Sequence, residues 1–408
     1  MSNIPKLRFP EFTDAWEKCK LGEVAKQAYG GGTPSTLIKE FWNGSIAWIQ
    51  SSDLKIDEIF PVIAKKFISK TALEKSATKL IPANSIAIVT RVGVGKLAVM
   101  SDKYTTSQDF ISLSNIQGDT FFIAYSLYSI LKKESNQAQG TSIKGITKVE
   151  LLNKTLYLPT LPEQQKIGNL FKQLDRLITL HKRKWDDVIL LKKALLQKMF
   201  PKNGSDFPEI RFPEFTDAWE KCKLGEVGKT YTGLSGKTKE DFGHGQAKFI
   251  TYMNVFGNPI ASSSGVDRIE IDSRQNEVKF GDVFFTTSSE TPEEVGMSSI
   301  WLENTENVYL NSFCFGYRPI KIFDPYFFAF YLRSPSIRAK IILLAQGISR
   351  YNISKTKMME QEISIPTLPE QQKIGNLFKQ LDRLITLHKR QHEHYQLLKK
   401  ALLQQMFV

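Results

Sequence analysis

The strongest constraint on the fold of this chain is an internal repeat. Three segments occur twice without a single change, the first pair 203 residues apart and the other two pairs 207 residues apart: Arg8–Val24 and Arg211–Val227, Pro159–Arg183 and Pro366–Arg390, and Leu190–Gln197 and Leu397–Gln404. Between them, residues 25–137 and 228–344 share little beyond their pattern. Self-similarity at a fixed offset is the signature of a repeated architecture. The sequence therefore predicts a pseudo-twofold repeat, in which one scaffold carries two different surfaces.

The repeated segment that starts at Pro159 has the pattern of a long helix. No proline occurs between Pro162 and Pro201, proline suits the first helical turn, and Glu163 is favourable beside a helix N-terminus. A helix from Pro162 to Met199 has 38 residues. At about 1.5 Å per residue its length is roughly 57 Å.

Apolar residues recur along both copies of this helix at heptad spacing. The main row consists of Ile167, Leu174, His181, Val188 and Leu195 in the first copy, and of Ile374, Leu381, His388, Tyr395 and Leu402 in the second. A second row starts with Leu170, Leu177, Lys184 and Leu191. Such a seam predicts that the two helices form an antiparallel coiled coil. A helix buried in a larger bundle is the alternative.

The middle of each helix carries a histidine. If the helices pair antiparallel and end to end, their midpoints meet near His181 and His388, so we predict a polar layer with the two rings close together. A polar residue in the seam can fix its register. The spacing of His388 and His392 could suggest a metal site, but zinc needs at least a third ligand, and Trp185 takes the place of His392 in the first copy. The sequence thus predicts no metal site.

Short β-like runs separated by turn signals dominate the variable segments. The predicted strands are Ile46–Ile49, Ser85–Thr90, Phe110–Leu113, Lys248–Thr251, Asp282–Thr287 and Phe313–Tyr317, and the predicted helices are Phe121–Leu131 and Pro325–Leu332. The predicted fold class is α+β, with two mixed α/β domains separated by the two long helices. The expected boundaries are 1–158 for the first domain, 159–200 for the first helix, 201–209 for a linker, 210–365 for the second domain and 366–408 for the second helix.

Motifs that would make the chain an enzyme are incomplete. A phosphate loop needs a glycine five positions before its Gly-Lys glycine, but Thr90 and Tyr231 stand there in the two candidate loops. The Asn-Pro-Pro-aromatic motif of adenine methyltransferases is absent. A nuclease-like arrangement of Asp267, Glu277 and Lys279 occurs once, in a polar stretch that we interpret as a solvated face. The sequence therefore predicts a protein without catalytic residues.

Composition narrows the cellular setting. The chain is 41% hydrophobic and 24% charged, as in ordinary globular proteins. It has only three cysteines, far apart, which excludes a disulfide framework and fits a reducing cytoplasm. Neither a transmembrane helix nor a secretory signal is expected, because no long uncharged apolar stretch occurs. The formal net charge of +13 suggests a polyanionic partner.

Each long helix is introduced by the same motif, Pro-Thr-Leu-Pro-Glu-Gln-Gln-Lys-Ile, at Pro159–Ile167 and again from Pro366. The segments before the two copies, Gly140–Lys148 and Gly347–Lys355, are also similar to each other. These motifs and the order of parts resemble the specificity subunits of type I restriction-modification systems. The resemblance covers nearly the whole chain. The two copies are unusually alike, which suggests sequence exchange between the units.

This resemblance implies a concrete function. Each variable domain would be a target-recognition domain that reads one half of a gapped sequence in double-stranded DNA, and the helices would set the gap. Two methyltransferase subunits would bring S-adenosylmethionine, and motor-nuclease subunits using ATP and magnesium would join them for cleavage. The chain itself would hold no cofactor. Pseudo-twofold symmetry in a protein matches the twofold relation of the two DNA strands.

Candidate DNA contacts follow from residue chemistry, because Arg suits guanine edges and Asn or Gln suits adenine edges. In the first domain they are Arg91, Lys96, Ser107, Gln108, Gln139, Ser142 and Lys144; in the second they are Tyr252, Asn254, Ser288, Asn311, Gln346, Ser349 and Arg350. Ordinary loop solvation is the alternative for each of them. Trp16 and Trp219 lie in identical segments, so we predict that they are packing anchors.

The second domain is less suited to binding phosphate by charge alone. Residues 209–365 carry 18 basic and 20 acidic side chains, against 20 basic and 14 acidic ones in residues 1–158. Phosphate neutralisation could then come largely from partner subunits. The alternative functions are an enzyme acting by itself and a coiled-coil scaffold that binds only proteins; the scaffold would leave the divergence of the two variable domains unexplained.

Overall fold

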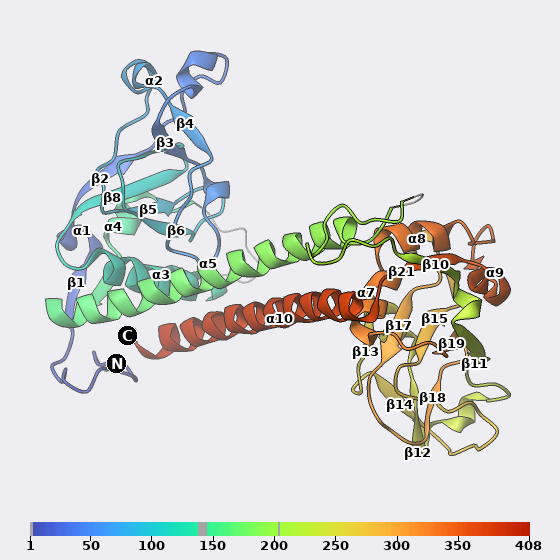
Figure 1. Cartoon of the computed structure of the whole chain (residues 1–408). Coiled ribbons are helices and arrows are strands. Elements are labelled where there is room, and N and C mark those ends of the chain that lie inside the picture. Colours follow the sequence, from blue (N-terminus) through green and yellow to red (C-terminus); the bar gives the residue numbers. More distant parts are fainter. Residues whose placement is uncertain (1–2, 138–144, 203–204) are drawn as a thin grey trace. The chain divides into compact units, whose positions relative to one another are not determined.

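The computed structural model describes residues 3–137, 145–202 and 205–408, and the chain divides into two compact units (Figure 1). Unit 1 comprises residues 1–184 and 387–408, and unit 2 comprises residues 185–386. Helix α5 (Leu161–Lys198) therefore begins in unit 1 and ends in unit 2, whereas α10 (Leu368–Gln405) does the reverse. Among the described residues, no helix is long and apolar enough to cross a membrane.

The repeated N-terminal segment forms a strand beside the start of each long helix. In unit 1, β1 (Glu17–Lys20) pairs antiparallel with β9 (Thr155–Leu158). In unit 2, β10 (Glu220–Lys223) pairs in the same way with β21 (Glu362–Ile365). Each variable segment is thus closed into a loop, whose two ends lie next to each other at a helix N-terminus.

The variable segment of unit 1 forms two sheets. The larger one is antiparallel with the order β2-β8-β5-β6, and the smaller one has the order β4-β3-β7. Their strands are β2 (Ala25–Gly30), β3 (Ile46–Ile49), β4 (Lys66–Ile68), β5 (Ser85–Val89), β6 (Leu97–Met100), β7 (Thr105–Thr106) and β8 (Phe110–Ile116). Helix α3 (Thr120–Gln137) packs against β5 and β6 (Figure 1). Every residue of these two strands is buried, as in sheets covered on both faces.

Unit 2 repeats this plan with different strands. Its main sheet has the order β11-β19-β15-β17-β13, and a second sheet has the order β14-β12-β18. The strands are β11 (Gly228–Thr232), β12 (Phe242–Ile250), β13 (Ile260–Ala261), β14 (Val266–Ile269), β15 (Val283–Thr286), β17 (Ser298–Trp301), β18 (Val308–Leu310) and β19 (Cys314–Pro319), with β16 (Ser288–Ser289) and β20 (Tyr351–Asn352) forming a separate pair.

Short helices complete both units. Those of unit 1 are α1 (Leu21–Val24), α2 (Lys70–Lys75) and α4 (Lys148–Leu152), and those of unit 2 are α6 (Tyr252–Gly257), α7 (Pro325–Leu332), α8 (Pro335–Ile342) and α9 (Lys355–Met359). Turns of 3-10 helix occur at Lys39–Trp42, Ser51–Asp53, Leu224–Glu226, Lys239–Asp241 and Pro292–Glu294.

Most predicted elements are present, with shifts at their ends. The strand at Ile46–Ile49 and the helix at Pro325–Leu332 have the predicted bounds. Helix α5 begins at Leu161, one residue earlier than predicted, and α10 begins at the corresponding Leu368, within the predicted segment 366–408. The largest differences are at α3, which ends at Gln137 rather than Leu131, and at β12, which starts at Phe242 rather than Lys248. A bulge in β12 lets both Phe242 and Ala247 pair with Ile269 of β14.

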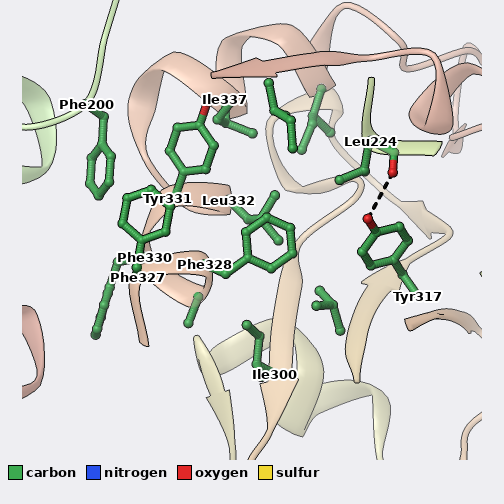
Figure 2. Close-up of a cluster of buried hydrophobic side chains, with 14 of the residues drawn as sticks. Phe200, Leu224, Ile300, Tyr317, Phe327, Phe328, Phe330, Tyr331, Leu332 and Ile337 are labelled. Carbon is green, nitrogen blue, oxygen red and sulfur yellow. Dashed lines mark hydrogen bonds between the residues drawn. The ribbon is translucent and has the colours of Figure 1, made fainter. Parts of the chain in front are cut away.

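The end of each long helix returns to a hydrophobic core. In unit 2, Phe200 follows α5 and is 1% exposed, with its ring against those of Trp219, Phe327, Tyr331 and Phe378. Figure 2 shows Phe200 beside Tyr331. In unit 1, Phe407 follows α10 and contacts Trp16, Phe122 and Phe171. The prediction that Trp16 and Trp219 are packing anchors is confirmed, since each is 2% exposed.

The shared Leu-Pro-Glu-Gln-Gln segment seats each helix on its domain. The buried carboxylate of Glu163 accepts hydrogen bonds of 2.7 and 2.8 Å from the guanidinium of Arg8. The amide of Gln164 donates to Pro159 O and accepts from the backbone N–H of Asp119. The same contacts occur in unit 2, where Arg211 donates to Glu370, and Gln371 donates to Pro366 O and accepts from the backbone N–H of Asp324.

A glycine lets the domain approach the helix closely. A Cβ at Gly168 would collide with Oδ1 of Asp119, the side chain that caps α3 by accepting from the N–H of Phe122. Gly375 has the same relation to Asp324, which caps α7. The N-terminus of a domain helix therefore lies directly on each long helix, at a place where any larger residue would force the two apart.

Within each unit the two long helices run antiparallel. In unit 1, Asp175 on α5 binds Lys399 on α10, and in unit 2 the corresponding residues Asp382 and Lys192 bind each other. The main predicted row lies toward this seam and the domain cores: Ile167, Leu174, Ile374 and Leu381 are fully buried, and Val188, Leu195, Tyr395 and Leu402 are partly so. The antiparallel pairing is confirmed.

The second predicted row is wrong in its later half, because Leu191 is 49% exposed and Lys184 is also exposed. Each of the two paired helices buries one face against the other helix. The domain covers a second face only near the start of the helix. The outer face farther along therefore stays open.

The predicted histidine layer is confirmed. Nδ1 of His181 and Nδ1 of His388 lie 3.1 Å apart, and the rings are 5.3 Å apart between centroids. Tyr395 packs against the other side of His181, and Nδ1 of His392 lies 3.1 Å from Ile178 O. One ring must donate and the other accept, so the contact favours at least one neutral imidazole. Burial, and then the nearby His388, lower the pKa of His181.

We expect the stability of unit 1 to fall as the pH drops through the histidine range. The unfolded chain binds protons at His181 more readily than the folded one, because the folded pKa is lowered; the stabilisation is therefore complete above the unfolded pKa of about 6.5 and is lost below it. Melting temperatures of the wild-type chain and of the double variant H181Q/H388Q, measured across this range, check the prediction. Parallel pH profiles for the two proteins would contradict it.

Candidate nucleic-acid interface

Three segments from different parts of the variable domain meet at one edge in unit 1. The N–H of Thr90, after β5, donates to Asp109 O, which precedes β8. The carbonyl of Thr90 accepts from Ile146, just before α4. The predicted contacts Arg91 and Gln108 are exposed at this junction. The end of β5, the start of β8 and the segment before α4 are thus joined into one continuous surface. The sequence suggests each of these three segments independently.

Unit 2 builds the same junction from different residues. Thr287, after β15, donates its N–H to Phe313 O, and its carbonyl accepts from Ile353, the residue that precedes the cap of α9. The pattern of backbone hydrogen bonds matches that at Thr90 in unit 1. Since the side chains around the two junctions differ, the scaffold presents two distinct chemistries at equivalent places.

The remaining predicted contacts of the first domain have different surroundings. Ser107 is 4% exposed and its hydroxyl donates to Asp109. Lys96 reaches Ser51 O at 3.4 Å and lines a hollow of about 220 Å³ beside the turn at Gly93. Gln139, Ser142 and Lys144 lie outside the described residues. Arg91 and Gln108 are therefore the side chains best placed to meet a ligand at this edge.

In unit 2 the structure gathers several predicted residues around one concave surface of about 870 Å³. It is lined by Tyr252, Met253 and Phe256 of α6, Ser288 and Ser289 of β16, Glu290, Glu294, Phe313, Ser349 and Arg350. The hydroxyl of Tyr252 donates to Ser288 O, and its ring is stacked on Phe256. Gln346 holds the neighbouring hairpin closed through two backbone hydrogen bonds with Asn352.

Two predicted contacts of the second domain have structural partners instead. Asn254 is 4% exposed, and its amide joins Ser262 O and Gly265 O within a turn. Asn311 is 5% exposed and donates to Ile250 O in the neighbouring strand. Their amides are already paired inside the domain, which corrects the expectation that they face DNA, because a buried amide needs its partners close at hand.

Sequence reasoning missed the acidic and apolar part of the concave surface. It selected hydrogen-bond donors near turns and so passed over Glu290, Glu294 and Met253. The one available signal was the dense run Ser288–Glu294, which contains three carboxylates in a loop after a buried strand.

Comparisons with known proteins agree with this two-unit construction. The family described as "Type I restriction modification DNA specificity domain" matches residues 13–190 and again residues 216–394. The type I restriction enzyme MjaIX specificity subunit of Methanocaldococcus jannaschii is 26% identical over 304 residues, covering 70% of this chain and 69% of the relative. The MjaVIII specificity subunit of the same organism is 23% identical over 437 residues, covering 97% and 92%.

A solved structure shares the fold. The crystal structure of the type I restriction-modification S subunit from M. genitalium superposes with a TM-score of 0.54 at 15% identity, covering 99% of both chains. The two family matches, one in each repeat, together span most of the sequence. The chain therefore belongs to the type I restriction-modification DNA specificity family.

Proposed function

We propose that this chain is the specificity subunit of a type I restriction-modification complex, in which each variable domain reads one half of a bipartite, gapped DNA target. The observation that carries this proposal is the pair of junctions at Thr90 and Thr287, which have the same backbone frame and different side chains. A protein that reads two unrelated half-sites needs this combination.

Direct reading of base edges fits the side chains at these places. Arg91 and Gln108 in the first domain offer donors for guanine and adenine edges, and Arg350 and Ser349 do so in the second. Since the second domain lacks an excess of basic residues, much of the phosphate neutralisation in the complex comes from partners and from the positively charged helices.

Two methyltransferase subunits are the partners that we propose for the helices. In unit 2, Leu190 and Leu191 are 64% and 49% exposed on α5. In unit 1, the identical pair Leu397 and Leu398 is 67% and 36% exposed on α10, where Leu397 borders a hollow of about 460 Å³. The same apolar face, present twice, suits two copies of one partner.

The methyltransferase subunits would bring S-adenosylmethionine to the complex. Motor-nuclease subunits would bring the chemistry that uses ATP and magnesium, and the whole complex would act in the cytoplasm.

Modified-base sequencing tests the proposal. DNA from cells that carry the partner methyltransferase is compared with and without this chain, and we expect a gapped motif with methylated adenine in each half only when the chain is present. Exchanging residues 228–344 for those of another family member should change one half of the motif and leave the other intact. A motif independent of the chain, or one unaffected by the exchange, would overturn the proposal.

A further inference from the structure

The concave surface of unit 2 is framed by backbone that two arginines hold in place. Arg333 follows α7, and its guanidinium donates to Ser298 O at 2.6 Å, Val255 O at 2.7 Å, Asn258 O at 2.9 Å and Phe256 O at 3.0 Å. Three of these carbonyls belong to the end of α6 and the residue after it. The wall that carries Tyr252, Met253 and Phe256 is therefore fixed from behind by one side chain.

Arg338 on α8 holds a second part of the lining, the segment that contains Glu294. It donates to Gly296 O at 2.7 Å, Val295 O at 2.7 Å and Glu293 O at 2.9 Å. These carbonyls flank Glu294, whose side chain lines the concave surface. Gly296 has a φ of +63°, so the loop turns in a left-handed conformation that the three hydrogen bonds help to maintain.

Neither arginine has an acidic partner in the part of the chain that the structure describes. Burial lowers the pKa of each to about 10, which marks the cost of covering a charge that only carbonyl dipoles compensate. A lysine could not replace either residue, since the planar fork of a guanidinium is needed to reach several carbonyls at once. Apolar side chains could fill the same space without the free-energy cost of burying a charge. The arginines are therefore better explained as rigid supports for the backbone around the concave surface.

The surface itself has chemistry for base edges rather than for phosphate. Glu290 and Glu294 line it together with Arg350, and carboxylates would repel a phosphate. One oxygen of Glu294 accepts from the hydroxyl of Ser289 at 3.0 Å, which orients the carboxylate and leaves its other oxygen available. In the major groove, carboxylates accept from the N4 amino group of cytosine, and arginine donates to guanine O6 and N7.

We propose that this concave surface reads a G·C pair in the second half-site, with Glu294 accepting from the cytosine N4 amino group, and that Arg333 and Arg338 are positioning residues for these two parts of its lining. The inference rests on the proposed function of the chain and assigns part of its target chemistry.

The first domain has no arginine at the two positions that match Arg333 and Arg338. Asp119 and Asp324 begin the corresponding domain helices α3 and α7. Counting from them, unit 1 has Tyr128 and Lys133 in the places of Arg333 and Arg338. The first half-site, read by the other domain of the same molecule, is therefore an internal control for every variant.

The experiment compares complexes of the partner methyltransferase with wild-type chain, E294Q, R338K and E293Q on a library of target variants, read out by modified-base sequencing. The wild type should require cytosine at one position of the second half. E294Q should relax that requirement by about tenfold or more, because one good base contact contributes discrimination of this order. E293Q changes a neighbouring carboxylate outside the lining and should resemble the wild type.

R338K should weaken discrimination at several positions of the second half and none of the first. A merely structural role predicts a different result, namely a uniform fall in methylation with the base preferences intact. An unchanged cytosine preference in E294Q, or a second half without G·C, would overturn the inference while leaving the specificity function standing. A wild-type complex that methylates no gapped motif would instead overturn the proposed function, and this inference with it.

Discussion

Replacing Phe200 by alanine should lower the free energy of unfolding of unit 2 by about 3–5 kcal/mol, the usual cost of truncating a buried aromatic side chain. Phe200 is 1% exposed, and its ring contacts four other aromatic rings, which come from α10, the repeated N-terminal segment and α7. The cavity would lie where these three parts join. None of them could move in to fill the cavity without losing its contacts with the other two.

Hydrogen exchange followed by mass spectrometry measures this loss segment by segment. The opening free energy of peptides from α7 and β17 should fall in F200A, and F407A should have the same effect on α3 and β6 in unit 1. Leu190→Ala on α5, the helix that Phe200 follows, is the matched control, since a largely exposed side chain contributes little, typically within about 0.5 kcal/mol. Losses below about 1 kcal/mol in F200A would show that the aromatic junction is not a main source of stability.

Replacing Lys399 by methionine should destabilise unit 1 by about 3–5 kcal/mol, because it leaves the carboxylate of Asp175 buried without its cation. Their side chains are 4% and 0% exposed and lie 2.5 Å apart. Asp175 also accepts from Tyr125 Oη at 2.6 Å and from the backbone N–H groups of Ile59 and Phe60. The pair thus fastens α10, α5 and the first recognition domain together.

The repeat supplies the matched control for this variant. Lys192 and Asp382 are the corresponding residues in unit 2, but their side chains are 19% and 38% exposed. Water can solvate Asp382 once its partner is gone, so K192M should cost no more than about 1 kcal/mol. Denaturant unfolding of both variants, compared with the wild type, measures the difference. Equal losses in the two variants would contradict the role of burial.

The effect of K399M should also depend on pH. Burial already raises the pKa of Asp175, against the opposing effect of Lys399. Without the lysine the folded state binds a proton at Asp175 more readily than the unfolded chain, so stability is regained as the pH falls. The deficit relative to the wild type should shrink as the pH falls from neutral to mildly acidic values, because burial raises the pKa of Asp175. A deficit that is constant over this range would mean that lost packing, and not the unpaired charge, causes the destabilisation.

The contrast between these ion pairs shows where sequence reasoning stops. Asp175 and Asp382 lie in identical segments with identical neighbours along the chain, so no local signal separates them. The difference comes from the variable domains. Tyr125 reaches Asp175, while the lysine that pairs with Asp382 packs over Phe330, which has no hydroxyl to offer. The loop at Ile59 covers only the first of the two carboxylates.

The same division applies to the candidate interface. Arg91, Gln108, Ser349 and Arg350 could be selected from the sequence, because basic and amide side chains beside turns are the usual readers of base edges. Asn254 and Asn311 fit that pattern equally well, yet their amides are paired within the domain. Glu294, Arg333 and Arg338 could not be found in this way, since what distinguishes them is the set of distant carbonyls and hydroxyls around them.

The sequence by itself determined the repeat, the antiparallel pairing of the helices, the histidine layer and the family, because identical segments, heptad spacing and a dense motif are properties of consecutive residues. Only the tertiary structure decided which copy of a repeated residue is buried and which polar side chains face outward. Burial and hydrogen bonding depend on chain segments a hundred or more residues away, and the two variable domains place different segments around the same scaffold.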